Sequence, residues 1–151
     1  MNMNRIRAPA VAALMAMTIV AGFAGSASVA DAAAQKADLH KVGPFPANQC
    51  AISATGAVEG FVVVNETERA EALIVEVSLK GGAPNKTYSV ALVQCRGTTF
   101  VARNVLGTLT TNGEGHGNLH GTAVERAAAT SALVTLAPVT GQRFASAKVT
   151  I

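Results

Sequence analysis

Tryptophan is absent from this chain of 151 residues, which contains one tyrosine and five phenylalanines. Proteins that bind single-stranded nucleic acid stack the bases on aromatic side chains. So few aromatic residues give little material for such a surface. The sequence therefore disfavours a nucleic-acid-binding protein.

An excess of one charge is also missing. The whole chain has 12 Lys+Arg and 9 Asp+Glu. Arg5 and Arg7 lie in an amino-terminal segment that we expect to be removed, and all the acidic residues follow it. Ten basic and nine acidic residues then remain. No basic stripe is left for a phosphate backbone, so we expect no nucleic-acid partner.

Catalytic groups are equally sparse. The aspartates are Asp31 and Asp38, both near the amino terminus, and no G-x-S-x-G motif occurs. A Ser-His-Asp triad needs a buried acid to orient its histidine. Glu59 or Glu125 would have to replace the aspartate. We therefore predict no enzymatic activity, no catalytic residues and no cofactor.

The chain begins with the pattern of a secretory signal peptide. Arg5 and Arg7 precede an apolar run from Val11 to Phe23, and small residues follow as far as Ala34. The run is shorter than the roughly 20 residues that span a bilayer. We predict a signal peptide over residues 1–30, with cleavage as late as residue 34, and no membrane span in the mature chain. The protein is expected outside the cell or in its envelope.

Two cysteines, Cys50 and Cys95, are separated by 45 residues. In an exported chain such a pair favours a disulfide. The spacing gives no zinc knuckle. We predict a Cys50–Cys95 bond and no metal site.

Alternating and β-branched segments indicate an all-β domain over residues 50–151. In residues 72–80 the large apolar side chains share one parity, which is typical of a half-buried strand. Residues 31–49 contain two prolines, and we predict a flexible approach there. The pattern predicts an antiparallel sandwich of about seven strands: residues 57–65, 72–80, 88–95, 106–111, 116–124, 131–137 and 144–151.

The glycine-rich stretch from Gly107 to Gly121 is predicted to form a β-hairpin. A phosphate cradle would lead into a helix, and this stretch leads into a strand. His116 and His120, four strand residues apart, would lie roughly 13 Å from each other. They are too distant to share one metal. We predict that Leu109 and Leu119 face the core opposite each other, with the tip in solvent.

Two segments, GGAPNKTYSVALVQC and GTLTTNGEGHGNL, resemble exported bacterial immunoglobulin-like domains. The resemblance covers residues 57–151 and rests mostly on turn residues. A weaker similarity, in Thr87–Val90 leading to Gln94-Cys95, is to neocarzinostatin-type apoproteins. That family has two disulfides, whereas this chain can form only one.

The first resemblance implies a secreted, non-catalytic binding or envelope-associated interaction module. Its partner would be an extracellular protein, a glycan or a small apolar ligand. The second implies the alternative of a carrier with an apolar cleft between its sheets. A deep pocket facing Phe61, Tyr88 or Phe100 would favour the carrier, and a filled core would favour the module.

Overall fold

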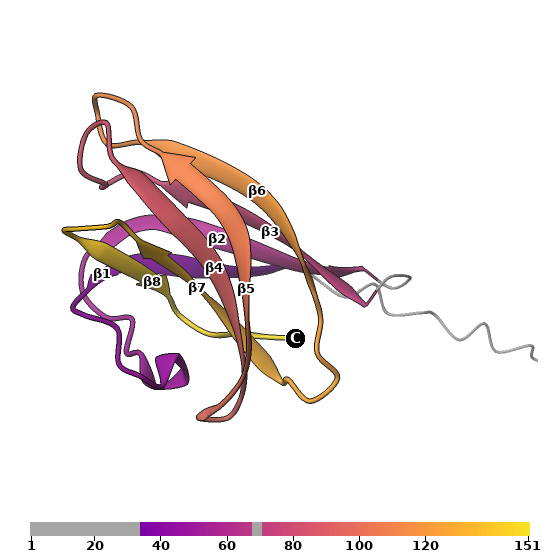
Figure 1. The fold of residues 1–151 in the computed structure, drawn as a ribbon. Helices are drawn as coiled ribbons and strands as arrows, with labels where there is room; N and C mark the ends of the chain where they lie inside the picture. Colours follow the sequence, from indigo (N-terminus) through magenta and orange to yellow (C-terminus); the bar gives the residue numbers. More distant parts are fainter. Residues whose placement is uncertain (1–33, 68–70) are drawn as a thin grey trace, which may run out of the picture.

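A computed structural model describes residues 34–67 and 71–151 (Figure 1). The predicted signal peptide, residues 1–30, lies outside the described residues. The described chain is all-β apart from one 3₁₀ turn, η1 (Gln49–Ala51), which confirms the predicted fold class. Its nine strands are β1 (Gln35–Val42), β2 (Val58–Thr67), β3 (Ala72–Leu79), β4 (Thr87–Arg96), β5 (Thr99–Thr110), β6 (Gly117–Val124), β7 (Ser131–Ala137), β8 (Arg143–Ser146) and β9 (Val149–Thr150).

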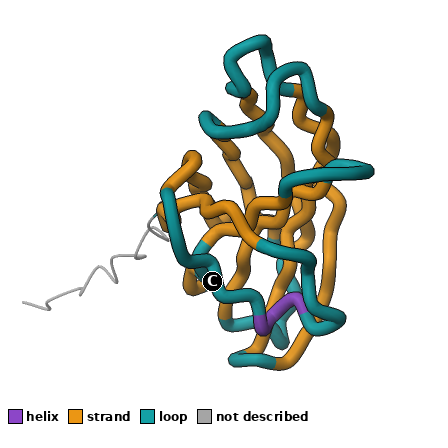
Figure 2. Tube along the Cα trace, turned by 90° about the vertical axis from the view of Figure 1, so that its left-hand side faces the viewer, coloured by secondary structure: helices purple, strands orange, loops and turns teal. Residues whose placement is uncertain are grey.

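All strand pairs in the described residues are antiparallel. The ladder runs β5-β4-β7-β8-β1-β2-β3-β6, and β9 pairs with β7. Its first and second halves form the two layers of a sandwich, and the β8–β1 pair joins them on one side. On the other side β5 contacts β6, so the sheet is nearly closed. Loops gather at the two ends of the strands (Figure 2).

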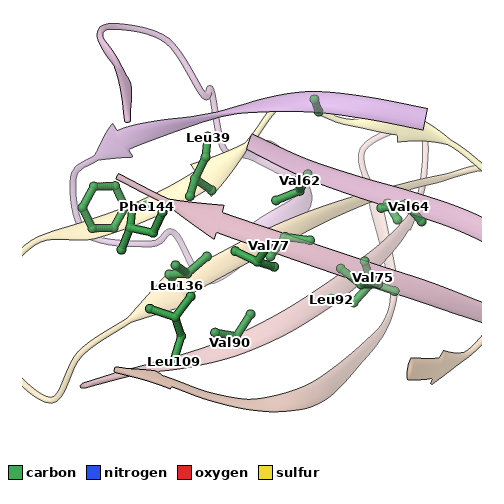
Figure 3. Packing of buried hydrophobic residues seen from close by; sticks show 14 of the residues in the cluster. Leu39, Val62, Val64, Val75, Val77, Val90, Leu92, Leu109, Leu136 and Phe144 are labelled. Atoms are coloured by element: carbon green, nitrogen blue, oxygen red, sulfur yellow. The ribbon is translucent and has the colours of Figure 1, made fainter. Parts of the chain in front are cut away.

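Strand alternation produces the core. In β3 the apolar side chains of one parity are buried while Glu76 points outward, because successive residues of a strand face opposite sides. Side chains from β1, β2 and β3 meet those from the other layer (Figure 3). The core includes Leu39, Val62, Val64, Val75, Val77, Val90, Leu92, Leu109, Leu136 and Phe144.

The amino-terminal region corrects one prediction. Residues 35–42, within the segment expected to be flexible, form β1 and pair with both β2 and β8. Ala37 and Leu39 are buried, while Lys36 and Asp38 face outward. The polar residues that suggested a flexible approach are thus the outward half of a strand. Cleavage at either predicted site would leave β1 intact.

The carboxyl-terminal region corrects a second prediction. Residues 144–151, predicted to be one strand, contain a break after Ser146 that separates β8 from β9. Ser146 donates its hydroxyl hydrogen to the carbonyl of Ala147 and accepts a hydrogen bond from the Val134 amide. This local hydrogen bond competes with ladder pairing. The break and β1 together account for nine strands where about seven were predicted.

The predicted disulfide is present. Cys50 and Cys95 are bonded, with their Cα atoms 5.9 Å apart. Both are buried in a second apolar cluster that also contains Val93, Leu133 and Ala145. These residues lie on the outer side of β4, β7 and β8, because their neighbours of opposite parity face the main core. The bond fixes the segment around η1 over this outer surface.

Glycines allow β5 and β6 to pack closely although neither pairs with the other in the described ladder. A Cβ atom on Gly121 would lie 3.0 Å from the Cβ of Leu106, and one on Gly117 would meet the side chain of Leu109. The missing side chains make room for leucines from β5. The seam between the two layers is therefore closed by side-chain packing.

Leu109 and Leu119 both face the core side, but their predicted pairing is wrong. Leu109 is fully buried and lies opposite Tyr88 on β4, while Leu119 is partly buried and lies opposite Val77 on β3. The two strands of the predicted hairpin belong to different layers. The connection consequently bridges the sandwich edge.

The tip of this connection also differs from the prediction. Glu114 is exposed, as expected, but Thr111 and Gly115 are buried. The Thr111 hydroxyl donates to the Ala83 carbonyl at 2.6 Å, and the Gly82 amide donates to the Gly115 carbonyl at 3.1 Å. The tip is packed on the loop between β3 and β4.

Candidate functional site

The three aromatic residues predicted to contact a ligand do not converge. Tyr88 is fully buried, and its ring packs edge-on against Phe144 with centroids 5.6 Å apart. Its hydroxyl accepts a hydrogen bond from the Ala83 amide at 3.0 Å. Tyr88 is therefore a core residue with a satisfied polar end.

Phe100 lies at the start of β5, opposite Cys95 on β4, and 48% of its surface is exposed. Two hollows in the outer surface lie beside Phe61, and Phe100 lines neither of them. Of the three aromatic residues predicted to contact a ligand, Phe61 therefore lies at a hollow in the described surface.

Phe61 occupies the outer side of the second layer, between two buried β2 neighbours. Strand register extends its surroundings across four strands. One cross-strand row consists of Asp38, Phe61, Ser78 and Asn118, and the next of Lys36, Val63, Glu76 and His120. We call these eight residues the Phe61 face.

Two hollows lie on either side of the Phe61 ring. One of about 360 Å³ extends over β3 and β6, where Ser78, Asn118 and His120 line it. The other, of about 310 Å³, extends over β1, the start of β2 and the residues after β3, where Glu59 and Lys80 line it. Phe61 lines both hollows. Their volumes fall at the lower end of the range of small-molecule sites.

Charged groups surround the apolar centre of the face. The Lys36 ammonium lies 4.7 Å from the centroid of the Phe61 ring, a cation–π contact. The His120 imidazole lies 3.8 Å from a Glu76 carboxylate oxygen, and both side chains are exposed. The face thus combines a half-buried aromatic ring with hydrogen-bond donors and acceptors. It also carries groups of both positive and negative charge.

The two histidines of the glycine-rich stretch have separate partners. His116 lies 3.6 Å from Glu114 in the connection between β5 and β6, whereas His120 contacts Glu76 on the sheet. Among residues 34–67 and 71–151, no three histidine, cysteine or acidic residues gather as metal ligands.

Acidic residues collect at the opposite end of β2, β3 and β6. Glu71 and Glu125 line a small hollow there, and the Glu125 amide donates to the Glu71 carbonyl at 2.7 Å. Partial burial, together with repulsion from Glu66 and Glu71, raises the pKa of Glu125 above its ordinary value.

Sequence reasoning missed most partners of Phe61. Lys36 and Asp38 were in the segment predicted to be flexible, because the apolar alternation of residues 35–42 is weak. Glu76 and Ser78 lie on the polar side of the strand predicted over residues 72–80. The register that aligns them with Asn118 and His120 depends on pairing between distant segments, which a single sequence does not show.

No helix in the described part of the chain is long and apolar enough to cross a membrane. No protein-family model, curated protein or solved structure matches the chain. Functional inference therefore rests on the Phe61 face and on the packing of the interior.

Proposed function

We propose that this protein is a secreted or envelope-associated binding module without catalytic activity, and that it binds its partner through the Phe61 face. The observation that carries the proposal is the contrast between the outer face and the interior. Both hollows beside Phe61 open on the outside of the sandwich, while the interior aromatic residues pack against each other.

The burial of the interior side chains speaks against the alternative of a carrier. A neocarzinostatin-like carrier needs an apolar cleft between its sheets. Here Tyr88, Phe144, Leu92 and Leu136 are completely inaccessible, and close-packed interiors leave few voids larger than a water molecule.

Export is supported by two features. The amino-terminal pattern is typical of a secretory leader, and the Cys50–Cys95 bond is stable in oxidising compartments. Immunoglobulin-like descent remains part of the proposal, supported by the antiparallel sandwich and by the turn residues near Tyr88.

The test is co-sedimentation of the exported protein with envelope fragments of the cells that produce it. We expect the native protein and Phe100→Ala to be retained, and Phe61→Ala to remain in the supernatant. Phe100 is a matched control, because it is an exposed phenylalanine that lines neither hollow at Phe61. Equal retention of all three proteins would contradict the proposal.

A further inference from the structure

We infer that the Phe61 face binds a neutral oligosaccharide of at least two sugar units. This inference rests on the proposed function and adds the chemical class of the ligand. It comes from the arrangement of apolar and polar groups over β1, β2, β3 and β6.

The centre of the face is apolar and its border is polar. Phe61 and Val63 are half-buried neighbours of one parity on β2. Their cross-strand neighbours are two carboxylates, a hydroxyl and an ammonium, those of Asp38, Glu76, Ser78 and Lys36. One strand further, on β6, an amide and an imidazole follow, those of Asn118 and His120. A pyranose ring has the complementary form, since its C–H groups form an apolar face and its hydroxyls radiate around the edge.

The polar groups also suit hydroxyls in number and type. Each sugar hydroxyl donates one hydrogen bond and accepts others, so it needs neighbours of both kinds. Asp38 and Glu76 accept, Lys36 donates, and Asn118 does both. Lys36 is exposed, so its ammonium is free to leave the Phe61 ring and donate to a hydroxyl when a sugar stacks there.

Charge disfavours an anionic ligand. Three carboxylates, those of Asp38, Glu59 and Glu76, line the two hollows, against the ammonium groups of Lys36 and Lys80. Bringing a phosphate, sulfate or uronate polymer to this surface would place like charges together. A neutral ligand avoids that repulsion.

Two hollows that share one aromatic ring indicate more than one sugar unit. A single ring stacked on Phe61 would leave at least one hollow unfilled. A linked pair places one unit over β3 and β6 and the other toward β1. We therefore expect a disaccharide to bind more tightly than its monosaccharide.

A peptide is less well suited to the face. Extended peptides gain affinity by hydrogen bonding to the backbone of an exposed sheet edge. The Phe61 face lies on the flat of the sheet, and β6, its last strand, contacts β5 on the other side. Side chains, and not free backbone groups, are what the face offers.

The experiment is an NMR titration of the ¹⁵N-labelled exported protein with cellobiose, maltose, lactose and N,N′-diacetylchitobiose, with their monosaccharides and dextran sulfate for comparison. We expect at least one disaccharide to shift the amide signals of Phe61, Ser78 and Asn118 in a saturable way. Phe61→Ala and Asn118→Ala should weaken this binding by about tenfold or more. Phe100→Ala should leave it unchanged.

Phe61→Leu protects the test against misfolding, because it keeps apolar area while removing the ring, and it should also weaken binding. Binding of dextran sulfate alone, or shifts confined to other strands, would overturn the inference. If none of the disaccharides binds while envelope retention still depends on Phe61, the sugar class is wrong and the binding module stands. If no disaccharide binds and envelope retention is also independent of Phe61, both the sugar class and the proposed binding module are wrong.

Discussion

Gln94 is a polar residue inside the sandwich that has a partner for each end of its amide. Its nitrogen donates to Asn104 Oδ1 at 3.0 Å and to the Val124 carbonyl at 2.8 Å, and its oxygen accepts from the Arg126 amide at 2.8 Å. The side chain is fully inaccessible. It therefore joins β4 to β5 and to the end of β6, where the two layers share no ladder.

We predict that Gln94→Ala lowers the free energy of unfolding by about 2–3 kcal/mol, because the groups it leaves behind lose their partners in a buried site. Urea denaturation measures the change. Asn118→Ala removes an amide from an exposed position and should change stability by no more than ~0.5 kcal/mol. Equal effects of the two variants would show that the Gln94 hydrogen bonds are unimportant.

Glu125 gives a prediction about how the stability of the fold depends on pH. Partial burial and repulsion from Glu66 and Glu71 raise its pKa in the folded state, so the folded protein holds this proton more tightly than the unfolded chain. Its contribution to stability is greatest at low pH and is lost as the pH rises through the raised pKa. Glu125→Gln should therefore raise the Tm at pH 7.

The same substitution should give no gain below about pH 4, where a glutamate is largely protonated. Thermal unfolding at both pH values checks this, with Glu114→Gln as an exposed control. A gain of the same size at both pH values would mean that Glu125 acts through packing and not through its charge.

Among the elements, regular alternation was the most dependable signal. It predicted β3 almost residue for residue, because four apolar side chains of one parity must reach the core together. In β1 only Ala37 and Leu39 are buried, so its pattern was weak and the strand was missed. The last strand was predicted unbroken because side-chain bonding at Ser146 leaves no clear mark in the sequence.

The connection between β5 and β6 illustrates a second limit. Glycine and asparagine correctly indicated a turn, but the packing of Gly115 against Gly82 involves a loop about thirty residues away in the chain. Gly115 has φ +83°, and a Cβ atom there would overlap the Gly82 carbonyl. A glycine needed for its backbone angle and one needed for close approach look the same in a sequence.

Gly115→Ala should accordingly lower the free energy of unfolding by at least ~2 kcal/mol, from left-handed strain and the clash together. Gly113, in the same tip, has open space around its missing Cβ and no positive φ. Gly113→Ala should be close to neutral. Denaturant unfolding of the pair would contradict the packed tip if both variants were equally tolerated.

At the scale of the whole molecule, the disulfide connects the segment around η1 to the outer surface of the first layer. Phe45 and Ile52 pack there against the cluster of Cys50, Cys95 and Leu133. Without the bond this segment would depend on modest apolar contacts and on the hydrogen bond that the Asn48 amide donates to the Thr98 carbonyl at 2.8 Å. The sequence predicted the bond correctly from the expected export and the number of cysteines, but it did not predict the surface that the bond covers.

The double variant Cys50→Ala/Cys95→Ala should lower the free energy of unfolding by roughly 3–4 kcal/mol. This is the effect expected when a closed loop of this length no longer restricts the unfolded chain. The 45-residue separation sets that value. Urea denaturation of the variant, and of the native protein under reducing conditions, should agree. A loss below ~1 kcal/mol in both would show that the bond contributes little to the fold.

The candidate site was predictable only in part. Phe61 was singled out in the sequence, but together with Tyr88, which belongs to the core, and Phe100, which lies elsewhere. Burial separates these three residues, and burial depends on the packing of two layers. The polar residues around Phe61 come from four strands, and they become neighbours only through long-range pairing.

The most direct test of a binding face at Phe61 is site-specific photo-crosslinking in the producing cells. Benzoylphenylalanine would replace Phe61, whose aromatic ring it keeps, or Val58, an exposed residue that lines the smaller hollow, and Val139 as a control. Val139 is 99% exposed, in the loop between β7 and β8. We predict crosslinked envelope material from positions 61 and 58 and none from position 139. Crosslinks from position 139 alone, or equally from all three positions, would contradict a binding face at Phe61.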